Sequence, residues 1–342
     1  MAPFNIPIVL FSFKRIEKIL IILERISKIE PSRLYLISDG GRTAEEHLLV
    51  KEVRKQVENH VTWKCELIKR YSDKNIGVYN NIAGGAQWVF KHEEQAIFLE
   101  DDNLPELSFF SFCEEILNYY KDDTRILWIC GTNYLKEYEP ADHSSYVVTK
   151  NMMPCGWASW SHKFTKYYDG EFELLEDSYI YRRIRKEKYY KPLKKQDWSN
   201  WMQELRRKKD GKPFLSWDYQ MSFTERIHNM YAIVPKYNQI ENIGVDIDSI
   251  HGGFSYENEM TKRFCGLPTR AMEFPIVHPK ALLIDEAFEI EVAKIITLPW
   301  RLRFKIRISS IIKKMIGIER DISLKAFLKT KLRQKIKSSI LV

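Results

Sequence analysis

The chain has 342 residues, of which 44% are hydrophobic and 13% aromatic, so it can build a packed core and is not a disordered protein. Its formal net charge is +8 at pH 7, but the surplus is local. Between Trp300 and Val342, 13 Lys or Arg stand against Glu319 and Asp321, a balance of +11 that leaves −3 for residues 1–299. The body lacks the basic surplus typical of nucleic-acid binding, and no nucleic-acid partner is expected.

The sequence shows no segment that would insert into a membrane or direct secretion. No apolar run reaches the roughly 18 residues that span a bilayer, and the N-terminal stretch MAPFNIPIVLFSFKR lacks the pattern of a signal peptide. The cysteines are odd in number and lack the close pairing of a zinc site; they are Cys65, Cys113, Cys130, Cys155 and Cys265. We expect free thiols in a reducing compartment and a cytoplasmic chain.

The first 131 residues alternate between strand-like and helix-like segments. Short apolar runs bounded by turn residues predict strands, and apolar residues three and four apart predict helices. Strands are expected at residues 7–13, 33–38, 65–69, 96–99 and 125–131, and helices at residues 16–26, 45–57, 86–92 and 109–119. This order is typical of a mostly parallel sheet with crossover helices, so the predicted fold class is α/β, with a central sheet flanked by helices.

Three consecutive acids end one of these strands. The apolar run from Ala96 to Leu99 precedes Glu100, Asp101 and Asp102, and ligands bind at the carboxyl ends of strands in open α/β sheets. Adjacent carboxylates repel one another, and a hard divalent cation carrying phosphates would relieve that repulsion. A solvated acidic turn is the alternative. Neither GxGxxG nor GxxxxGK[ST] occurs, which argues against a dinucleotide site and a P-loop.

The second part of the chain is less regular. Aromatic residues gather at 153–160, and a polar, very basic stretch runs from Tyr181 to Lys212. We interpret that stretch either as a helical excursion over an acceptor site or as a solvated face. From about Leu298, basic residues alternate with Ile, Leu, Phe and Met. This pattern is typical of a basic amphipathic helix on an anionic membrane surface, and a helix packed on the body is the alternative.

Several motifs occur in an order that resembles a known family. They are PIVLFSFKR, ISDGG, NIGVYNNIAGG, FLEDD, the Gly-Trp pair of PCGWASW, SWDYQ and NIGVDIDSIHGG. Over residues 5–280 the chain resembles the GT-A fold glycosyltransferases, and within them the N-acetylglucosaminyltransferase I type and its bacterial relatives in surface-polysaccharide synthesis. The resemblance implies a GT-A domain at residues 1–285, with a nucleotide-sugar half at 1–131 and an acceptor half at 132–285. A helical basic tail at 286–342 would follow.

The same resemblance implies the residues of a donor site. Asp102 would hold a divalent ion, Mn²⁺ or Mg²⁺, that bridges the donor diphosphate, while Glu100 and Asp101 would hold the ribose and order the site. The other residues that would contact or lie near the nucleotide are Phe11, Arg15, Asp39, Asn75, Gly77 and Asn80. Asp39 would accept a hydrogen bond from a uracil-like base, and Gly77 would let the backbone approach the donor.

Sugar transfer also needs a group that removes the proton of the acceptor hydroxyl. Asp218 matches the family's base position, and the rings of Trp217 and Tyr219 beside it would line the sugar pocket; a helix N-cap next to a core tryptophan is the alternative. His251 is interpreted either as a second metal ligand or diphosphate contact, or as a surface histidine. The family, rather than any spacing in the sequence, implies inversion at the anomeric carbon.

The sequence thus predicts a metal-dependent inverting glycosyltransferase, a hexosyl- or N-acetylhexosaminyltransferase whose expected donor is a UDP-sugar. Its acceptor would be a glycan or a lipid-linked molecule at the inner face of the cell membrane, where the basic tail would bind the anionic surface. Two alternatives stay open. A sugar nucleotidyltransferase usually carries a glycine-rich basic loop after the first strand, which FSFKRIEK lacks. A non-catalytic GT-A-like scaffold would not need intact Asp102 and Asp218.

Overall fold

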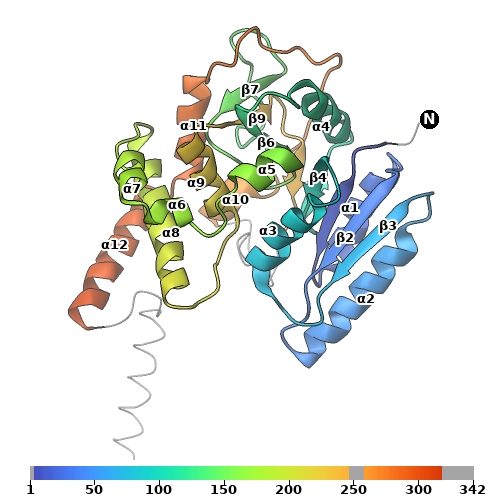
Figure 1. The fold of residues 1–342 in the computed structure, drawn as a ribbon, viewed down its shortest axis with the longest axis horizontal. Coiled ribbons are helices and arrows are strands. Elements are labelled where there is room, and N and C mark those ends of the chain that lie inside the picture. The colour runs from blue at the N-terminus through green and yellow to red at the C-terminus, as the bar shows by residue number, and fades with distance from the viewer. Residues whose placement is uncertain (1–3, 246–257, 318–342) are drawn as a thin grey trace, which may run out of the picture. The chain divides into compact units, whose positions relative to one another are not determined.

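The computed structural model describes residues 4–245 and 258–317. The chain forms two compact units, residues 1–296 and residues 297–342, and each is described by itself. The elements of both units are labelled in Figure 1.

The first unit extends beyond the predicted end of the domain at residue 285. Helix α11 (Glu286–Ile296) belongs to this unit, and its Phe288 and Val292 are fully buried. Because these two apolar side chains lie four residues apart, they share one face of the helix, which packs into the core. Residues 286–296, which the sequence assigned to the tail, thus lie in the first compact unit.

An eight-stranded sheet forms the centre of the first unit, in the order β3-β2-β1-β4-β8-β6-β9-β7. Its strands are β1 (Ile8–Ser12), β2 (Arg33–Ser38), β3 (Glu66–Tyr71), β4 (Gln95–Leu99), β6 (Ile126–Cys130), β7 (Tyr146–Thr149), β8 (Trp157–Trp160) and β9 (Tyr231–Pro235). Strands β7 and β8 run against their neighbours, and the others run in one direction. A separate antiparallel pair joins β5 (Asn103–Pro105) to β10 (Ile240–Asn242). The predicted α/β fold with a mostly parallel sheet is confirmed.

Helices cover both faces of this sheet (Figure 1). The helices in the described part of the first unit are α1 (Ile16–Ser27), α2 (Ala44–His60), α3 (Gly77–Val89), α4 (Ser108–Tyr119), α5 (Ser161–Tyr167), α6 (Glu173–Glu176), α7 (Ser178–Ile184), α8 (Lys191–Lys209), α9 (Asp218–His228), α10 (Glu259–Phe264) and α11. Helix α12 (Trp300–Met315) lies in the second unit. None of the described helices has the length and apolar character needed to cross a membrane.

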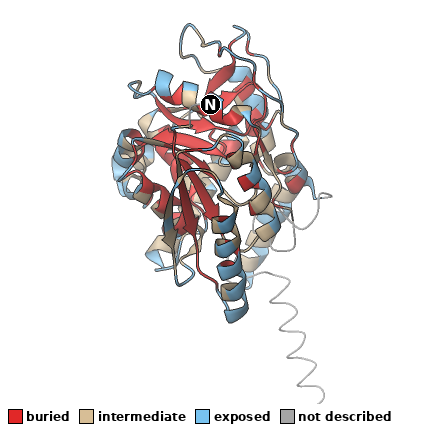
Figure 2. Ribbon diagram, turned by 90° about the vertical axis from the view of Figure 1, so that its right-hand side faces the viewer, coloured by how far each residue is buried: buried red, intermediate tan, exposed pale blue. Residues whose placement is uncertain are grey.

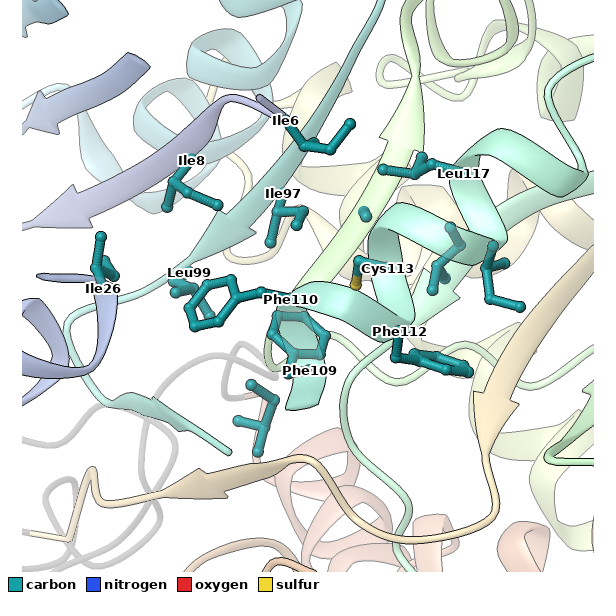
Figure 3. Close-up of a cluster of buried hydrophobic side chains, with 14 of the residues drawn as sticks. Ile6, Ile8, Ile26, Ile97, Leu99, Phe109, Phe110, Phe112, Cys113 and Leu117 are labelled. Carbon is teal, nitrogen blue, oxygen red and sulfur yellow. The ribbon is translucent and has the colours of Figure 1, made fainter. Parts of the chain in front are cut away.

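The hydrophobic core has one layer on each side of the sheet, because successive strand residues point to opposite faces. In β1, Ile8 and Leu10 join a layer with α1, α2 and α4, while Val9 and Phe11 join the opposite layer with α3, α9 and α11. Figure 2 shows that the strands of the sheet are largely buried. Figure 3 shows part of the first layer, to which α4 contributes Phe110.

Helix α3 begins nine residues before the predicted helix at 86–92. The adjacent glycines Gly84 and Gly85 weakened the helical pattern, since glycine is a poor helix former. The structure explains one of them: a Cβ at Gly85 would lie 2.8 Å from the ring of Phe11 and 3.0 Å from the side chain of Ile37. Glycine therefore lets α3 pack closely on the sheet, and tertiary packing outweighs the local propensity.

Strand β8 contains the Gly-Trp motif's tryptophan, and the sequence pattern did not predict it. The strand pairs antiparallel with both β4 and β6. The Trp157 ring stacks between Phe98, at a centroid distance of 3.9 Å, and Trp128, at 4.0 Å. Such aromatic stacking across three neighbouring strands fixes the middle of the sheet beside the acid-tipped strand β4.

Helix α9 carries a carboxylic acid in the core. Glu225 is fully buried, and neither of its carboxylate oxygens has a hydrogen-bond partner among the described residues. Burial raises its pKa well above the ordinary range, and the charge of Glu289 adds to the rise while Arg226 opposes it. Folding therefore retains a proton that the unfolded chain releases above about pH 4.3, so this residue lowers the free energy of unfolding as pH rises.

We predict that Glu225→Met raises the free energy of unfolding, because it removes a buried acceptor without a partner, by about 1–3 kcal/mol. The gain should be larger at pH 8 than at pH 5, measured by urea unfolding. The matched control is Glu286→Met on α11, an exposed position where no pH-dependent gain is expected. A loss of stability, or an equal change at both pH values, would contradict this account of Glu225.

Candidate functional site

The direction in which strands are added to the sheet changes between β1 and β4. From β1 the chain builds β2 and β3 on one side, and then crosses to place β4 on the other side of β1. In open α/β sheets, ligands bind outside the carboxyl ends of strands at such a switch point. The segment after β1, with Phe13 and Arg15, meets the acids after β4 at this position.

One arginine holds two of the three acids. Arg15 Nη1 donates to Asp101 Oδ1 at 3.1 Å and to Asp102 Oδ2 at 2.9 Å, and the backbone N–H of Phe13 donates to Asp101 Oδ2 at 3.2 Å. These contacts join the loop after β1 to the end of β4. They also give the adjacent carboxylates a positive partner from the chain itself.

Glu100 and Asp101 have pKa values above those of ordinary carboxylic acids. Burial, followed by the charge of Asp102, raises the pKa of Asp101 to about 6, although Arg15 opposes the rise. Burial also raises the pKa of Glu100 well above its usual range, and the charges of Asp102, Asp101 and Asp218 add to it. A further cation at this position would relieve the same repulsion.

Asn103 orients the acids, and the sequence analysis missed it. It is buried; its side-chain amide donates to Asp102 Oδ1 at 2.7 Å, and its Oδ1 accepts from the N–H groups of Glu100 at 3.3 Å and Gly156 at 2.7 Å. The acidic turn is thereby tied to the Gly-Trp motif. An amide that follows an acidic run directly was the available signal, but its partner Gly156 lies 53 residues away.

The β10 segment forms another wall of the site. The N–H of Ile243 donates to the backbone oxygen of Asp102 at 2.9 Å, and a Cβ at Gly244 would lie 2.3 Å from Asp102 Oδ2. Only glycine fits against the carboxylate there. Cys155 lies close by, because its Sγ accepts from the Asn242 amide at 3.5 Å. Its pKa is raised well above the usual range by burial and by the charges of Asp102 and Glu100.

Asp39 joins the end of β2 to the start of α3. Its Oδ1 accepts from the N–H groups of Gly40 and Ile76, each at 2.8 Å. Its Oδ2 accepts from the Asn75 amide at 2.9 Å and from the N–H of Gly77 at 3.1 Å. These contacts fix the carboxylate at the end of β2, and its contact with a base stays a prediction.

Other predicted donor residues lie around this junction. Asn75 is committed to Asp39, Gly77 begins α3 with a positive φ of 82°, and Asn80 donates to the backbone oxygen of Ile76 at 2.9 Å. The Phe11 side chain is only 3% exposed and lies in the core beside Phe98. The Phe11 ring is therefore part of the core and does not face the site.

Asp218 lies within electrostatic range of the acidic turn. It is the first residue of α9, with Trp217 as the buried N-cap residue, and its carboxylate contacts the Ser216 hydroxyl. The Asp218 charge contributes to the raised pKa values of Glu100 and Tyr168. The fold thus brings Asp218 near Glu100 across more than a hundred residues of sequence. Asp218 is thus the first residue of the helix, and Trp217, rather than Asp218, occupies the N-cap position.

The described donor atoms fit a hard divalent cation at one protein carboxylate. Asp102 accepts one hydrogen bond from Asn103 and one from Arg15, so about two of its four lone-pair sites remain for other ligands. Oxygen donors suit Mn²⁺ and Mg²⁺, and Mg²⁺ is often held by one or two carboxylates plus substrate phosphates. Among the described residues no group of three or more His, Cys, Asp or Glu is arranged as a metal site. His251 lies outside the described residues.

Comparisons with known proteins found solved structures only, since no family model and no curated protein matches. A mannosyltransferase from Pyrobaculum calidifontis in complex with GDP-Man and Mn²⁺ is 12% identical, with a TM-score of 0.34, over 66% of this chain and 70% of that one. A UDP-glucose pyrophosphorylase complexed with UDP-glucose is 10% identical, with a TM-score of 0.35, over 69% and 93%.

A third similar structure is glucosyl-3-phosphoglycerate synthase from Mycobacterium tuberculosis in complex with Mn²⁺, UDP and glucosyl-3-phosphoglycerate. It is 9% identical, with a TM-score of 0.26, over 47% of this chain and 58% of that one. Identities of 9 to 12% and TM-scores of 0.26 to 0.35 establish neither a family nor an activity for this chain.

We predict that Asn103→Ala lowers the free energy of unfolding by about 1–3 kcal/mol, because the buried N–H of Gly156 loses its acceptor. Asn103→Asp keeps that acceptor but sets a carboxylate against Asp102. It should therefore destabilise less than Asn103→Ala at pH 4 and at least as much at pH 8. Urea unfolding at both pH values checks this, and a pH-independent difference between the two variants would contradict the role given to the amide.

Proposed function

We propose that this chain is a metal-dependent inverting glycosyltransferase that moves a hexosyl or N-acetylhexosaminyl group from a nucleotide sugar, with a UDP-sugar as the expected donor. The observation that supports it most is the position of the three acids at the change in strand order, with Asp218 within electrostatic range of them. The acids after β4 stand at the switch point of the sheet, and Asp218 lies close enough to raise the pKa of Glu100. The acids after β4 would hold the donor diphosphate through a metal ion, and Asp218 would act on the acceptor.

The donor half of the proposal rests on Asp102, Asp101 and Arg15. Asp102 keeps free acceptor capacity and would hold the divalent ion, which when bound supplies Lewis-acid stabilisation of the departing diphosphate. Arg15 fixes Asp102 and Asp101 in place, so the ligand carboxylate is oriented before the donor arrives. Glu100 and Asp101 hold their protons tightly and would meet the ribose hydroxyls.

The acceptor half rests on Asp218. Its carboxylate would take the proton of the acceptor hydroxyl, and the proton would stay on Asp218 until it is released to water. Tyr219 follows it in the sequence, and the Tyr168 hydroxyl donates to the backbone oxygen of Trp217, its other sequence neighbour, at 3.1 Å; the rings of both tyrosines would flank the sugar. Attack from the face opposite the diphosphate inverts the anomeric carbon. The proposed acceptor is a lipid-linked molecule or polysaccharide in surface-glycan synthesis.

The second unit supports a location on the inner face of the cell membrane. Seven large hydrophobic residues of α12 are exposed, and five of them recur at spacings of three and four, which puts these five on one side of the helix. The five are Trp300, Phe304, Ile308, Ile311 and Met315, and the other two are Ile306 and Ile312. Basic side chains lie between them in the sequence. An apolar stripe with Lys and Arg suits the surface of an anionic bilayer.

A thermal-shift screen tests the donor site. With UDP and Mn²⁺ at about one hundred times Kd, the melting temperature should rise by roughly 5 °C, since binding stabilises the folded state by about 2.7 kcal/mol. Asp102→Ala should abolish the metal-dependent rise, while Asp122→Ala, at an exposed position, should keep it. No rise with UDP, GDP, CDP or dTDP would contradict the proposal and favour a non-catalytic scaffold.

Asp218→Asn tests the base. The variant should keep the Mn²⁺-dependent thermal shift but lose UDP release from UDP-sugars by roughly 100-fold to 10,000-fold, as expected when a general base is removed. A variant as active as the wild type would show that another group takes the proton. Formation of a nucleotide sugar from a nucleoside triphosphate and a sugar phosphate would instead identify a sugar nucleotidyltransferase.

The double variant Phe304→Ser, Ile311→Ser tests the membrane role of α12. Partition into vesicles with 30 mol% phosphatidylglycerol, a composition of roughly the charge of an anionic leaflet, should fall by about tenfold or more per side chain, because each loses burial in lipid. The matched control is Leu48→Ser, Leu283→Ser, two exposed leucines in the first unit. Equal partition of the two double variants would contradict the role given to α12.

A further inference from the structure

A second strongly basic surface lies in the first unit, on residues 178–212. We call it the cationic face and define it by its ten exposed Lys and Arg side chains. They are Arg182, Arg183, Arg185, Lys186, Lys188, Lys191, Lys195, Arg206, Lys209 and Lys212. Of the four acids in the same range, only Asp210 is exposed. The face therefore carries a large positive charge that the acids of the same segment do not balance.

Two of the three acids that are not exposed pair with one arginine of α9. Arg226 is buried; it pairs with Glu187 at 3.5 Å and with Asp197 at 3.8 Å. Asp197 also accepts from the hydroxyl of Tyr189 at 2.9 Å. Glu204 is fully buried, with one oxygen accepting from the N–H of Leu215 at 2.9 Å. Because these acids are held inside, the outward charge is a fixed property of the fold.

Amphipathic aromatic side chains lie among the bases. Tyr179 is 64% exposed. Tyr181 and Trp198 contact each other edge to face at 4.9 Å, and the Arg185 guanidinium lies 5.4 Å from the Trp198 ring centroid. Tyr and Trp favour the interface between lipid and water, where one end of the ring is apolar and the other wet. Bases alone would suit any polyanion, but bases interleaved with these aromatics suit phospholipid headgroups.

The cationic face is rigidly joined to the helix that bears Asp218. Trp201 of α8 packs edge to face on Phe223 of α9 at 5.3 Å, inside a small hydrophobic core shared by α6, α7, α8 and α9. The Leu215 N–H bond to Glu204 fixes the segment that leads into Asp218. A surface bound to this face therefore lies at a set position relative to the proposed base.

We infer that the cationic face is a membrane-docking surface for an anionic bilayer, separate from α12. It would hold the Asp218 side of the molecule against the headgroups, which makes a lipid-linked molecule the acceptor class in place of a soluble polysaccharide. The assignment of the acceptor class rests on the proposed function, whereas docking itself requires no nucleotide and no catalysis.

The test uses the full chain and vesicle sedimentation without nucleotide. The docking variant is Arg182→Gln, Lys186→Gln, Lys191→Gln, Lys195→Gln. Its matched control is Lys28→Gln, Lys51→Gln, Lys55→Gln, Lys91→Gln, which removes the same charge from exposed positions on other elements. Both are compared with wild type, alone and combined with Phe304→Ser, Ile311→Ser. Far-UV circular dichroism and melting temperature confirm that each variant folds.

The docking variant should lose at least tenfold in partition to vesicles with 30 mol% phosphatidylglycerol, because each basic residue at an anionic surface contributes roughly fivefold. The control should lose less than threefold, and partition to pure phosphatidylcholine should be weak and equal for all. Equal partition of the docking and control variants would overturn the inference. So would a loss seen only for soluble heparin, which would make the face a site for soluble polyanions. Failure of the UDP thermal shift would leave these outcomes unchanged.

Discussion

The repulsion among three neighbouring carboxylates is the constraint on which the site depends. Burial makes it severe, and the pKa of Asp101 rises to about 6 despite its contact with Arg15. The Arg15 guanidinium, in the segment after β1, offsets part of this repulsion. It reaches the acids because β1 and β4 are adjacent parallel strands whose carboxyl ends lie at one edge of the sheet. The change in strand order falls between the same two strands, and α/β sheets commonly bind ligands at such a position. The strand order therefore brings together the acids and the arginine that pairs with them.

Two aspartates that look alike in the sequence differ in the number of hydrogen bonds that they accept. Both Asp39 and Asp102 follow a buried strand, and both were assigned to the ligand. Asp39 accepts four hydrogen bonds from its own chain and is saturated, whereas Asp102 accepts two from Asn103 and Arg15. A saturated carboxylate stabilises a junction, and one with spare lone pairs can take a new partner. The number of hydrogen bonds that each carboxylate accepts distinguishes Asp39 from Asp102, whereas the residue type does not.

The parts of the fold that local pattern determines could be predicted from the sequence. Strand β2 was predicted with its observed bounds, and β1, β4 and β6 lie within a residue or two of them, because short apolar runs make buried strands. Tertiary contacts decided the rest: Gly85 allows α3 to pack on Phe11, and stacking on Phe98 and Trp128 holds β8. In the candidate site, the acids and Asp218 are predictions from motifs. Asn103 was missed because its partner Gly156 is distant in sequence.

Helix α9 connects the proposed chemistry with the surface of the first unit. Asp218 opens its first turn, and Arg226 lies in its last turn. By pairing with Glu187 and Asp197 in the interior, Arg226 keeps two acids away from the bases of the cationic face. The helix that carries the proposed base thus also adds to the net positive charge of that face. Since a helix of 11 residues is rigid, a partner bound at that face meets Asp218 in a fixed geometry.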